Sequence, residues 1–223
     1  DWEYNVSAGH VPGERLLHAA RLSSAVLTAI SVAAAFAIAW IAGGRPAAWA
    51  TALIYASDPA VLLNGRRAMM EGAHLAFATL TVLAALLVVR EQGRRPAPRR
   101  RRLVGLTALF GIMGGAAVAS KHPALIVVGV GFATIASEPF IRRTPSPLNR
   151  RRILRWIGAG VLVLLTFLVL NPAWWSDPLH MPGRVLELRG HLLDQQVAGY
   201  GGYDGLGERL EGMVRQAFGL EPQ

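Results

Sequence analysis

The feature that most limits how this chain can fold is a series of apolar runs, each about 20 residues long and separated by charged residues. A helix rises about 1.5 Å per residue, so a run of this length crosses the roughly 30 Å hydrocarbon core of a bilayer. The runs are apolar on all sides, whereas a helix of a soluble bundle has a polar face. We therefore predict an all-α polytopic transmembrane bundle of about six spanning helices. The runs are Leu22–Ala42, Pro46–Leu63, Met69–Val89, Leu103–Ser120, Ala124–Ile141 and Ile153–Leu170.

Two short arginine-rich loops predict how the bundle is oriented. Arg90–Arg102 holds seven arginines and one acid, and Arg142–Arg155 holds six arginines. Short loops rich in arginine stay on the cytoplasmic side. Two apolar runs lie between these loops, so both fall on that side, and the same counting places Gly43–Arg45 there.

The remaining polar segments then fall on the outer face, which also carries most of the acids. Twelve of the 14 acidic residues lie in or beside these outer segments. The chain divides into the end of an external loop (1–21), a transmembrane region (22–171) and an extracytoplasmic part (172–223). In that last part, two sets of apolar residues at helical spacing predict amphipathic helices that lie on a surface. The sets are Val185, Leu188, Leu192 and Leu193, then Leu206, Leu210, Met213, Val214, Ala217 and Phe218.

Composition excludes several classes of protein. There is no cysteine, which rules out disulfides and thiolate metal sites. No Walker or Rossmann glycine pattern is present, and no histidine pair has metal-ligand spacing. The net charge is +9, but the arginines punctuate apolar runs, so we expect membrane lipids and no nucleic acid as partners. The chain begins at Asp1, and we expect it to be part of a longer polypeptide.

A group of polar side chains at the outer face is the candidate site. Lys121 is the only lysine in the chain. Arginine donates bidentate bonds to phosphate, and lysine supplies a point charge. A basic cluster just below the outer headgroups is suited to a lipid-linked phosphate. The candidate substrate-binding residues are Arg66, Arg67, Glu71, Lys121, His122, Trp174 and Trp175.

Each of these residues also has a reading that needs no ligand. Arg66 and Arg67 can extend to lipid headgroups, and Glu71 can pair with Arg67 one turn away. Lys121 can anchor a helix end. The two tryptophans stand where an interfacial aromatic belt is expected.

Other residues predict local structure. Asp58 precedes a proline, which favours a break in the second run. Gly111 and Gly115 stand four apart and allow close approach of a neighbouring helix. His74, on an apolar helix, is typical of a core histidine.

Four segments together carry a resemblance to a known family. They are HAARLSSAVLTAI (18–30), DPAVLLNGRRAMMEGAHLAFATL (58–80), GIMGGAAVASKHPAL (111–125) and NPAWWSDPL (171–179). Their order resembles the membrane glycosyltransferases of the GT-C type, in the phospholipid carrier-dependent branch (family 39 type) of protein O-mannosyltransferases and lipid A aminoarabinose transferases.

The resemblance implies an enzyme of the plasma membrane that crosses it several times. Such an enzyme transfers a sugar from polyprenyl phosphate, usually with inversion, to a protein, lipid or glycan acceptor on the outer face. Basic residues hold the departing phosphate, a role that Arg66, Arg67 and Lys121 match, and Glu71 matches an acidic position of the family. The family's catalytic aspartate lies in the first external loop, in the part that would precede Asp1. A divalent metal ion as cofactor stays open, as do the sugar and the acceptor.

The alternative class is a non-enzymatic membrane protein, either a transporter or an assembly subunit. A transporter favours broken helices at matching positions of two halves. The break at Asp58 has no counterpart in the second half. In an enzyme, Arg66, Arg67 and Lys121 should converge on one cavity, whereas in a structural subunit they should point to headgroups.

We predict that Lys121 and Trp174 lie on the same, non-cytoplasmic side of the membrane. Because the chain lacks cysteine, a single cysteine at either position can be probed with a membrane-impermeant thiol reagent. Both should react from outside in intact cells. Labelling from opposite sides would contradict the six-span topology.

Overall fold

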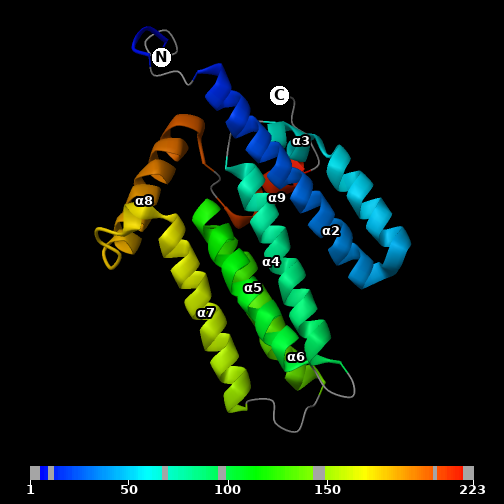
Figure 1. The fold of residues 1–223 in the computed structure, drawn as a ribbon. Coiled ribbons are helices and arrows are strands. Elements are labelled where there is room, and N and C mark those ends of the chain that lie inside the picture. The colour runs from blue at the N-terminus through cyan, green and yellow to red at the C-terminus, as the bar shows by residue number, and fades with distance from the viewer. Residues whose placement is uncertain are drawn as a thin grey trace. The chain divides into compact units, whose positions relative to one another are not determined.

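The structure, a computed structural model, describes residues 6–9, 13–66, 70–94, 99–142, 149–202 and 205–217. Within these ranges the regular elements are helices, as the all-α prediction requires, and no strand occurs (Figure 1). They are α2 (Glu14–Ser57), α3 (Pro59–Arg66), α4 (Glu71–Gln92), α5 (Arg100–Ser120), α6 (Ala124–Ile141), α7 (Arg150–Leu170), the short 3-10 helix η1 (Pro172–Trp174), α8 (Met181–Tyr200) and α9 (Leu206–Ala217).

The chain forms two compact units. The first covers Asp1–Pro172 and holds the apolar helices α2 to α7. The second covers Ala173–Gln223 and holds α8 and α9, two helices where the sequence predicts amphipathic ones. On α8 and α9 the side chains of Leu188, Leu192, Leu210 and Met213 are exposed.

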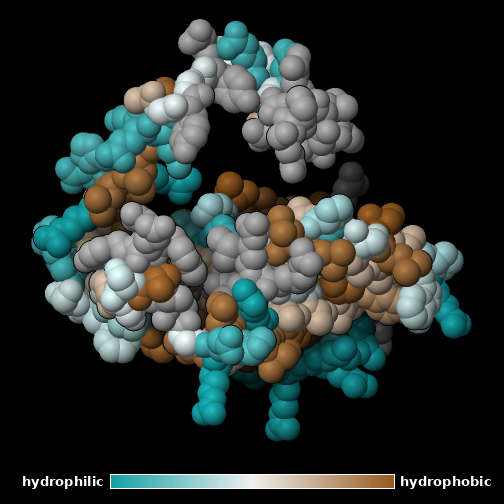
Figure 2. Space-filling model, turned by 90° about the horizontal axis from the view of Figure 1, so that it is seen from above, coloured by the Kyte–Doolittle hydropathy of each residue, from teal (hydrophilic) through white to brown (hydrophobic). Residues whose placement is uncertain are grey.

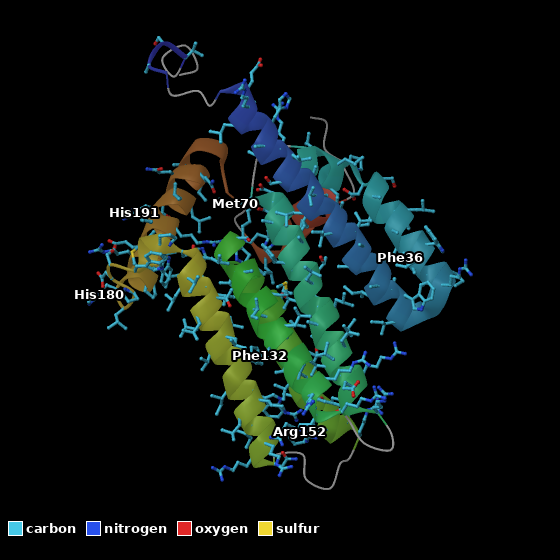
Figure 3. The ribbon with its side chains drawn as sticks, in the orientation of Figure 1. Phe36, Met70, Phe132, Arg152, His180 and His191 are labelled. Atoms are coloured by element: carbon cyan, nitrogen blue, oxygen red, sulfur yellow. The ribbon has the colours of Figure 1, made fainter. Side chains whose placement is uncertain are left out.

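Helix α2 is a hairpin of two helical arms. At Gly44 the backbone leaves the helical region with φ 74° and ψ −165°, a conformation that glycine adopts without steric cost, and Pro46 follows. The chain turns back there, so the ring of Phe36 meets that of Trp49, with centroids 5.3 Å apart (Figures 1 and 3). The first predicted run and the part of the second run up to Ser57 are therefore the two arms of α2, and the rest of the second run lies in α3.

The predicted break at Asp58 is confirmed. Helix α2 ends at Ser57, and Asp58 is extended, with ψ 123°. The Asp58 carboxylate accepts hydrogen bonds from the backbone N–H groups of Ala60 at 2.8 Å and Val61 at 3.0 Å. Asp58 thus acts as the N-cap of α3, since it satisfies N–H groups that have no partner inside the helix.

Helix α2 begins at Glu14, which corrects the prediction of a loop up to residue 21. The segment from Glu14 to Arg21, ERLLHAAR, contains no glycine or proline. Its residues are mostly strong helix formers, so the helix continues beyond the apolar run.

Helices α4 and α5 form the centre of the first unit. Helix α4 packs against α2, α5 and α6, and α5 packs against α4, α6 and α7. The two arginine loops lie at one end of this bundle, which we call the arginine end (Figure 1). There the guanidinium of Arg142, after α6, lies directly over Gly93, after α4. Figure 3 places Met70 and Arg152 at opposite ends of the bundle.

Two acidic side chains, Glu91 and Glu138, form ion pairs with arginines at the arginine end. Glu91 is only 5% exposed, accepts a hydrogen bond from the Arg99 N–H at 2.9 Å, and forms ion pairs with Arg94 at 3.7 Å and Arg102 at 3.5 Å. Glu138 pairs with Arg142 at 2.8 Å. These are the two acids that the sequence places away from the outer face, and each neutralises arginines of its own loop.

The described part of the chain has five helices long and apolar enough to cross a membrane: α2, α4, α5, α6 and α7. Their large aliphatic side chains face outward: Ile54 is 71% exposed, Ile126 72% and Ile141 77%. Figure 2 shows such hydrophobic side chains, in brown, on the outside of the molecule. A surface of this kind is stable only in contact with lipid.

Gly111 and Gly115 bring α5 against α7, as their spacing predicts. A Cβ added at Gly111 would lie 2.8 Å from the carbonyl oxygen of Ala159. A Cβ added at Gly115 would lie 2.5 Å from that of Val163. Both contacts are with backbone, which cannot rotate away. The small residues of α5 therefore determine how closely α7 packs.

We predict that Gly115→Ala lowers the stability of the bundle by about 1–3 kcal/mol, because the added methyl group must push α7 away. The control is Gly105→Ala on the same helix, where an added Cβ meets nothing within 4 Å. That control should be neutral or stabilise by up to about 1 kcal/mol, since alanine favours the helix. Thermal unfolding of both variants in detergent tests this, and equal melting temperatures would contradict the α5–α7 contact.

Candidate functional site

An ion pair between Glu71 and Lys121 forms the centre of the candidate site. The Lys121 Nζ donates to the Glu71 Oε1 at 2.7 Å. Glu71 is the first residue of α4, and Lys121 is the C-cap of α5, with φ −153° and ψ 129°. An acid at a helix start and a base at a helix end both complement the helix dipole. Because α4 and α5 are antiparallel neighbours, these two ends lie side by side.

The pair is half-buried and leaves hydrogen-bonding capacity unused. The side chain of Glu71 is 20% exposed and that of Lys121 39%. The second carboxylate oxygen of Glu71 is buried without a hydrogen-bond partner among the described residues. An ammonium group has three N–H donors, and one of those on Lys121 is used by Glu71. The arrangement can thus orient a lysine while leaving donors for an anion.

His74 lies beside this pair, one turn further along α4. Its ring lies against the carbonyl of Ala117 on α5 and within electrostatic range of Lys121 and Glu71. Its Nδ1 is buried and has no hydrogen-bond partner among the residues that the structure describes. A histidine with a spare ring nitrogen beside an ion pair differs from the satisfied core histidine that the sequence favours.

His122 links the pair to α7. It follows Lys121 in the short turn between α5 and α6, and its ring centroid lies 6.1 Å from that of Phe167 on α7. Asn171, which ends α7, donates from its side chain to the Phe167 carbonyl at 2.8 Å. The starts of α4 and α6 and the ends of α5 and α7 therefore meet at the same end of the bundle, opposite the arginine end.

Gly65 and Gly72, which lie before and after Arg66–Arg67 in the sequence, pack against α2. A Cβ at Gly65 would lie 2.8 Å from the Thr28 hydroxyl, and one at Gly72 would lie 2.7 Å from the Ser24 carbonyl. Arg66 ends α3. The side chain of Arg66 and the whole of Arg67 lie outside the described residues, so their convergence with Lys121 stays a prediction.

The tryptophans belong to the second unit. Trp174 is the last residue of η1, and Trp175 follows it with 63% exposure. Their role in the same site as Lys121 stays a prediction.

An apolar groove of about 250 Å³ lies between α2 and α3, and Gly65 is among the residues that line it. Ala25, Ala29 and Val32 of α2 line one wall, and Val61 and Leu62 of α3 line another. A groove of this composition accepts a hydrocarbon chain and no charged group.

We find no group of three or more histidine and acidic side chains placed to hold a metal ion within the described ranges.

A comparison with known protein families finds a family whose sequence model matches nearly four fifths of this sequence. The sequence model of the family described as dolichyl-phosphate-mannose-protein mannosyltransferase matches residues 1–175. The chain belongs to this mannosyltransferase family. No curated protein and no solved structure matches it.

Family membership agrees with the GT-C resemblance seen in the sequence. The region that matches the family contains α2 to α7, and with them both Glu71 and Lys121. Membership of this family and the five helices that are long and apolar enough to cross a membrane indicate an integral membrane protein that crosses the bilayer several times.

The pairing of Glu71 with Lys121 is the feature that sequence reasoning missed. The sequence offers Arg67 as the partner of Glu71, whereas the structure supplies a lysine 50 positions away. The sequence did contain a feature that could have predicted this pair: one of the few acids and the only lysine stand at the ends of two consecutive apolar runs, and these ends adjoin when the two helices are antiparallel.

We predict a measurable coupling between Glu71 and Lys121. Glu71→Gln and Lys121→Met each leave the other charge without its partner, so the double variant should lose less stability than the two single losses added together. We expect a coupling of about 0.5–1.5 kcal/mol, in the lower part of the range for contacting residues because Lys121 is partly solvated. Thermal unfolding of the four proteins measures it, and strictly additive losses would show that the pair is not formed.

Proposed function

We propose that the protein transfers mannose from a polyprenyl phosphate of the dolichyl type to a hydroxyl group of a protein, on the extracytoplasmic face and with inversion. The observation that carries this proposal is Lys121. It is presented by Glu71 at the end of the bundle opposite the arginine end, inside the region that matches the mannosyltransferase family.

The reaction requires a cation next to the leaving group. The acceptor oxygen attacks the anomeric carbon of mannose, and the bond from that carbon to the phosphate oxygen breaks. The acceptor proton passes to a base, and polyprenyl phosphate leaves with one more negative charge than it had in the donor. A fixed positive group at this oxygen stabilises the transition state more than the ground state.

Lys121 is suited to this role by its contact with Glu71. The 2.7 Å bond holds the ammonium in one position and uses one of its three N–H donors. The other two donors can bind phosphate oxygens. In this proposal Glu71 is a positioning residue, because its Oε1 is already engaged by the lysine.

The apolar groove supports a lipid-linked donor. Its lining includes Gly65, which stands just before Arg66 and only a few residues along the chain from Glu71. A polyprenyl chain in the groove would bring its phosphate to the segment with Arg66 and Arg67, which we propose as further phosphate-binding residues. We propose that His122, Trp174 and Trp175 complete the substrate site, and that the enzyme resides in the plasma membrane.

The test measures mannose transfer from polyprenyl-phosphate mannose to an acceptor peptide by the intact protein in membranes. Lys121→Ala should lower kcat by about 10²–10³, as removal of one transition-state donor does elsewhere, with a smaller change in KM. Lys121→Arg should retain part of the activity, because it keeps the charge.

The matched control is Arg45→Ala, which also removes one cation but lies in the hairpin turn of α2, next to Gly44. It should leave kcat unchanged at equal protein abundance. Equal rates for Lys121→Ala and the unchanged protein would overturn the phosphate-holding role.

A further inference from the structure

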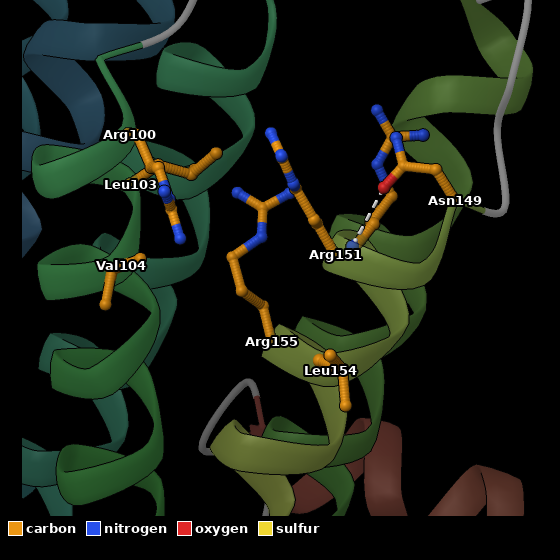
Figure 4. A pocket seen from close by; sticks show the side chains of 8 residues that line it. Arg100, Leu103, Val104, Asn149, Arg151, Leu154 and Arg155 are labelled. Carbon is orange, nitrogen blue, oxygen red and sulfur yellow. Dashed lines mark hydrogen bonds between the residues drawn. The ribbon is translucent and has the colours of Figure 1, made fainter.

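A cavity lined by arginine and aliphatic side chains lies at the arginine end of the bundle, away from the proposed transfer site. It has a volume of about 420 Å³, within the range of small-ligand sites, and lies between the first turns of α5 and α7 (Figure 4). Its polar wall comes from Arg100 on α5 and from Asn149, Arg151, Arg152 and Arg155 at the start of α7. Figure 4 shows Arg151 and Arg155 extending from α7 into the space between the two helices.

The described residues that line the cavity concentrate positive charge. Four arginines line it, Arg100, Arg151, Arg152 and Arg155, and its lining contains no acidic residue. Arg152 and Arg155 also repel each other. This differs from the neighbouring loops, where Glu91 and Glu138 neutralise arginines within 4 Å.

The helix ends add to the same positive field. A helix start carries a partial positive charge and favours acidic residues. Helices α5 and α7 both begin at this cavity, and neither has an acid in its first turn. Only Asn149 caps α7, by accepting from the Arg152 N–H at 3.0 Å. Glu91 accepts from the Arg99 N–H before α5 but does not line the cavity, so an anion bound among the arginines of the lining would complement both helix starts.

The rest of the lining indicates which anion fits. Leu103, Val104 and Leu154 form the apolar part of the wall, and the side chains of Val104 and Leu154 are 48% and 56% exposed. These residues belong to membrane-spanning helices, so the cavity joins a basic surface to the lipid-facing sides of α5 and α7. A free phosphate ion would use only the basic part, whereas a phospholipid would use both parts.

We propose that this cavity binds the phosphate group of an anionic phospholipid, with the acyl chains along the apolar wall. Guanidinium groups bind phosphate oxygens in bidentate pairs, which suits the arginines of two helices closing on one phosphate. Helix α7 packs mainly on α5. The bound lipid therefore joins the starts of α5 and α7 and holds α7 in the bundle.

The experiment uses the intact protein in nanodiscs and measures its melting temperature. Phosphatidylglycerol in place of part of the phosphatidylcholine should raise the melting temperature, and native mass spectrometry should show retained phosphatidylglycerol. The variant Arg151→Gln with Arg155→Gln should bind this lipid about tenfold more weakly or worse, since two charge-assisted contacts are lost, and should lose the thermal shift.

The matched control is Arg101→Gln with Arg150→Gln, which removes the same charge from the first turns of the same two helices but from residues outside the cavity wall. It should keep the shift. Equal losses in the two double variants would show non-specific attraction of headgroups and overturn the site. An equal shift from inorganic phosphate alone would overturn the lipid as ligand.

If Arg151→Gln with Arg155→Gln does not fold, Arg100→Gln on the opposite wall replaces it with the same expected loss. Retention of phosphatidylglycerol no greater than that of phosphatidylcholine by the unchanged protein would also overturn the proposal. Mannose transfer is not the readout, so the result is separate from that of the proposed function.

Discussion

The hydrocarbon core excludes unpaired charge, and the distribution of charged side chains in this protein follows from that exclusion. Backbone groups must be satisfied within each segment, which makes every crossing a helix. In helices α4 to α7 the charged side chains lie near the helix ends, where several of them pair with one another. The interior of the bundle is therefore left to packing, and small residues such as Gly111 and Gly115 decide which helices approach closely.

The two ends of the bundle differ in how far their basic side chains are paired with acidic ones. At one end, the only lysine meets a glutamate of the neighbouring helix at 2.7 Å, and the pair is nearly neutral before any substrate arrives. At the other end, arginines outnumber acids, and a cavity between α5 and α7 contains arginines alone as its charged groups. The first arrangement orients a single cation, which suits the proposed reaction, and the second suits the binding of an anion, as proposed for the cavity.

The antiparallel hairpin of α4 and α5 connects these features. It brings residue 71 beside residue 121 at one end and residue 91 beside residues 99 and 102 at the other. Because both contacts belong to the same helix pair, the proposed substrate site and the proposed lipid site share one structural element. Helix α7, held to α5 by glycine contacts, extends this element to the lipid cavity, and α2 extends it to the apolar groove.

The sequence alone determined the helical class, the runs that become helices, the break at Asp58 and the sharing of one end by both arginine loops. These depend on local hydropathy and on proline and acid positions, which act over a few residues. Only the tertiary structure decided that Lys121 is the partner of Glu71, that Gly44 turns α2 into a hairpin and that α5 and α7 enclose a basic cavity. Such contacts join residues far apart in the chain, and which helix face meets which neighbour depends on side-chain packing that hydropathy does not encode.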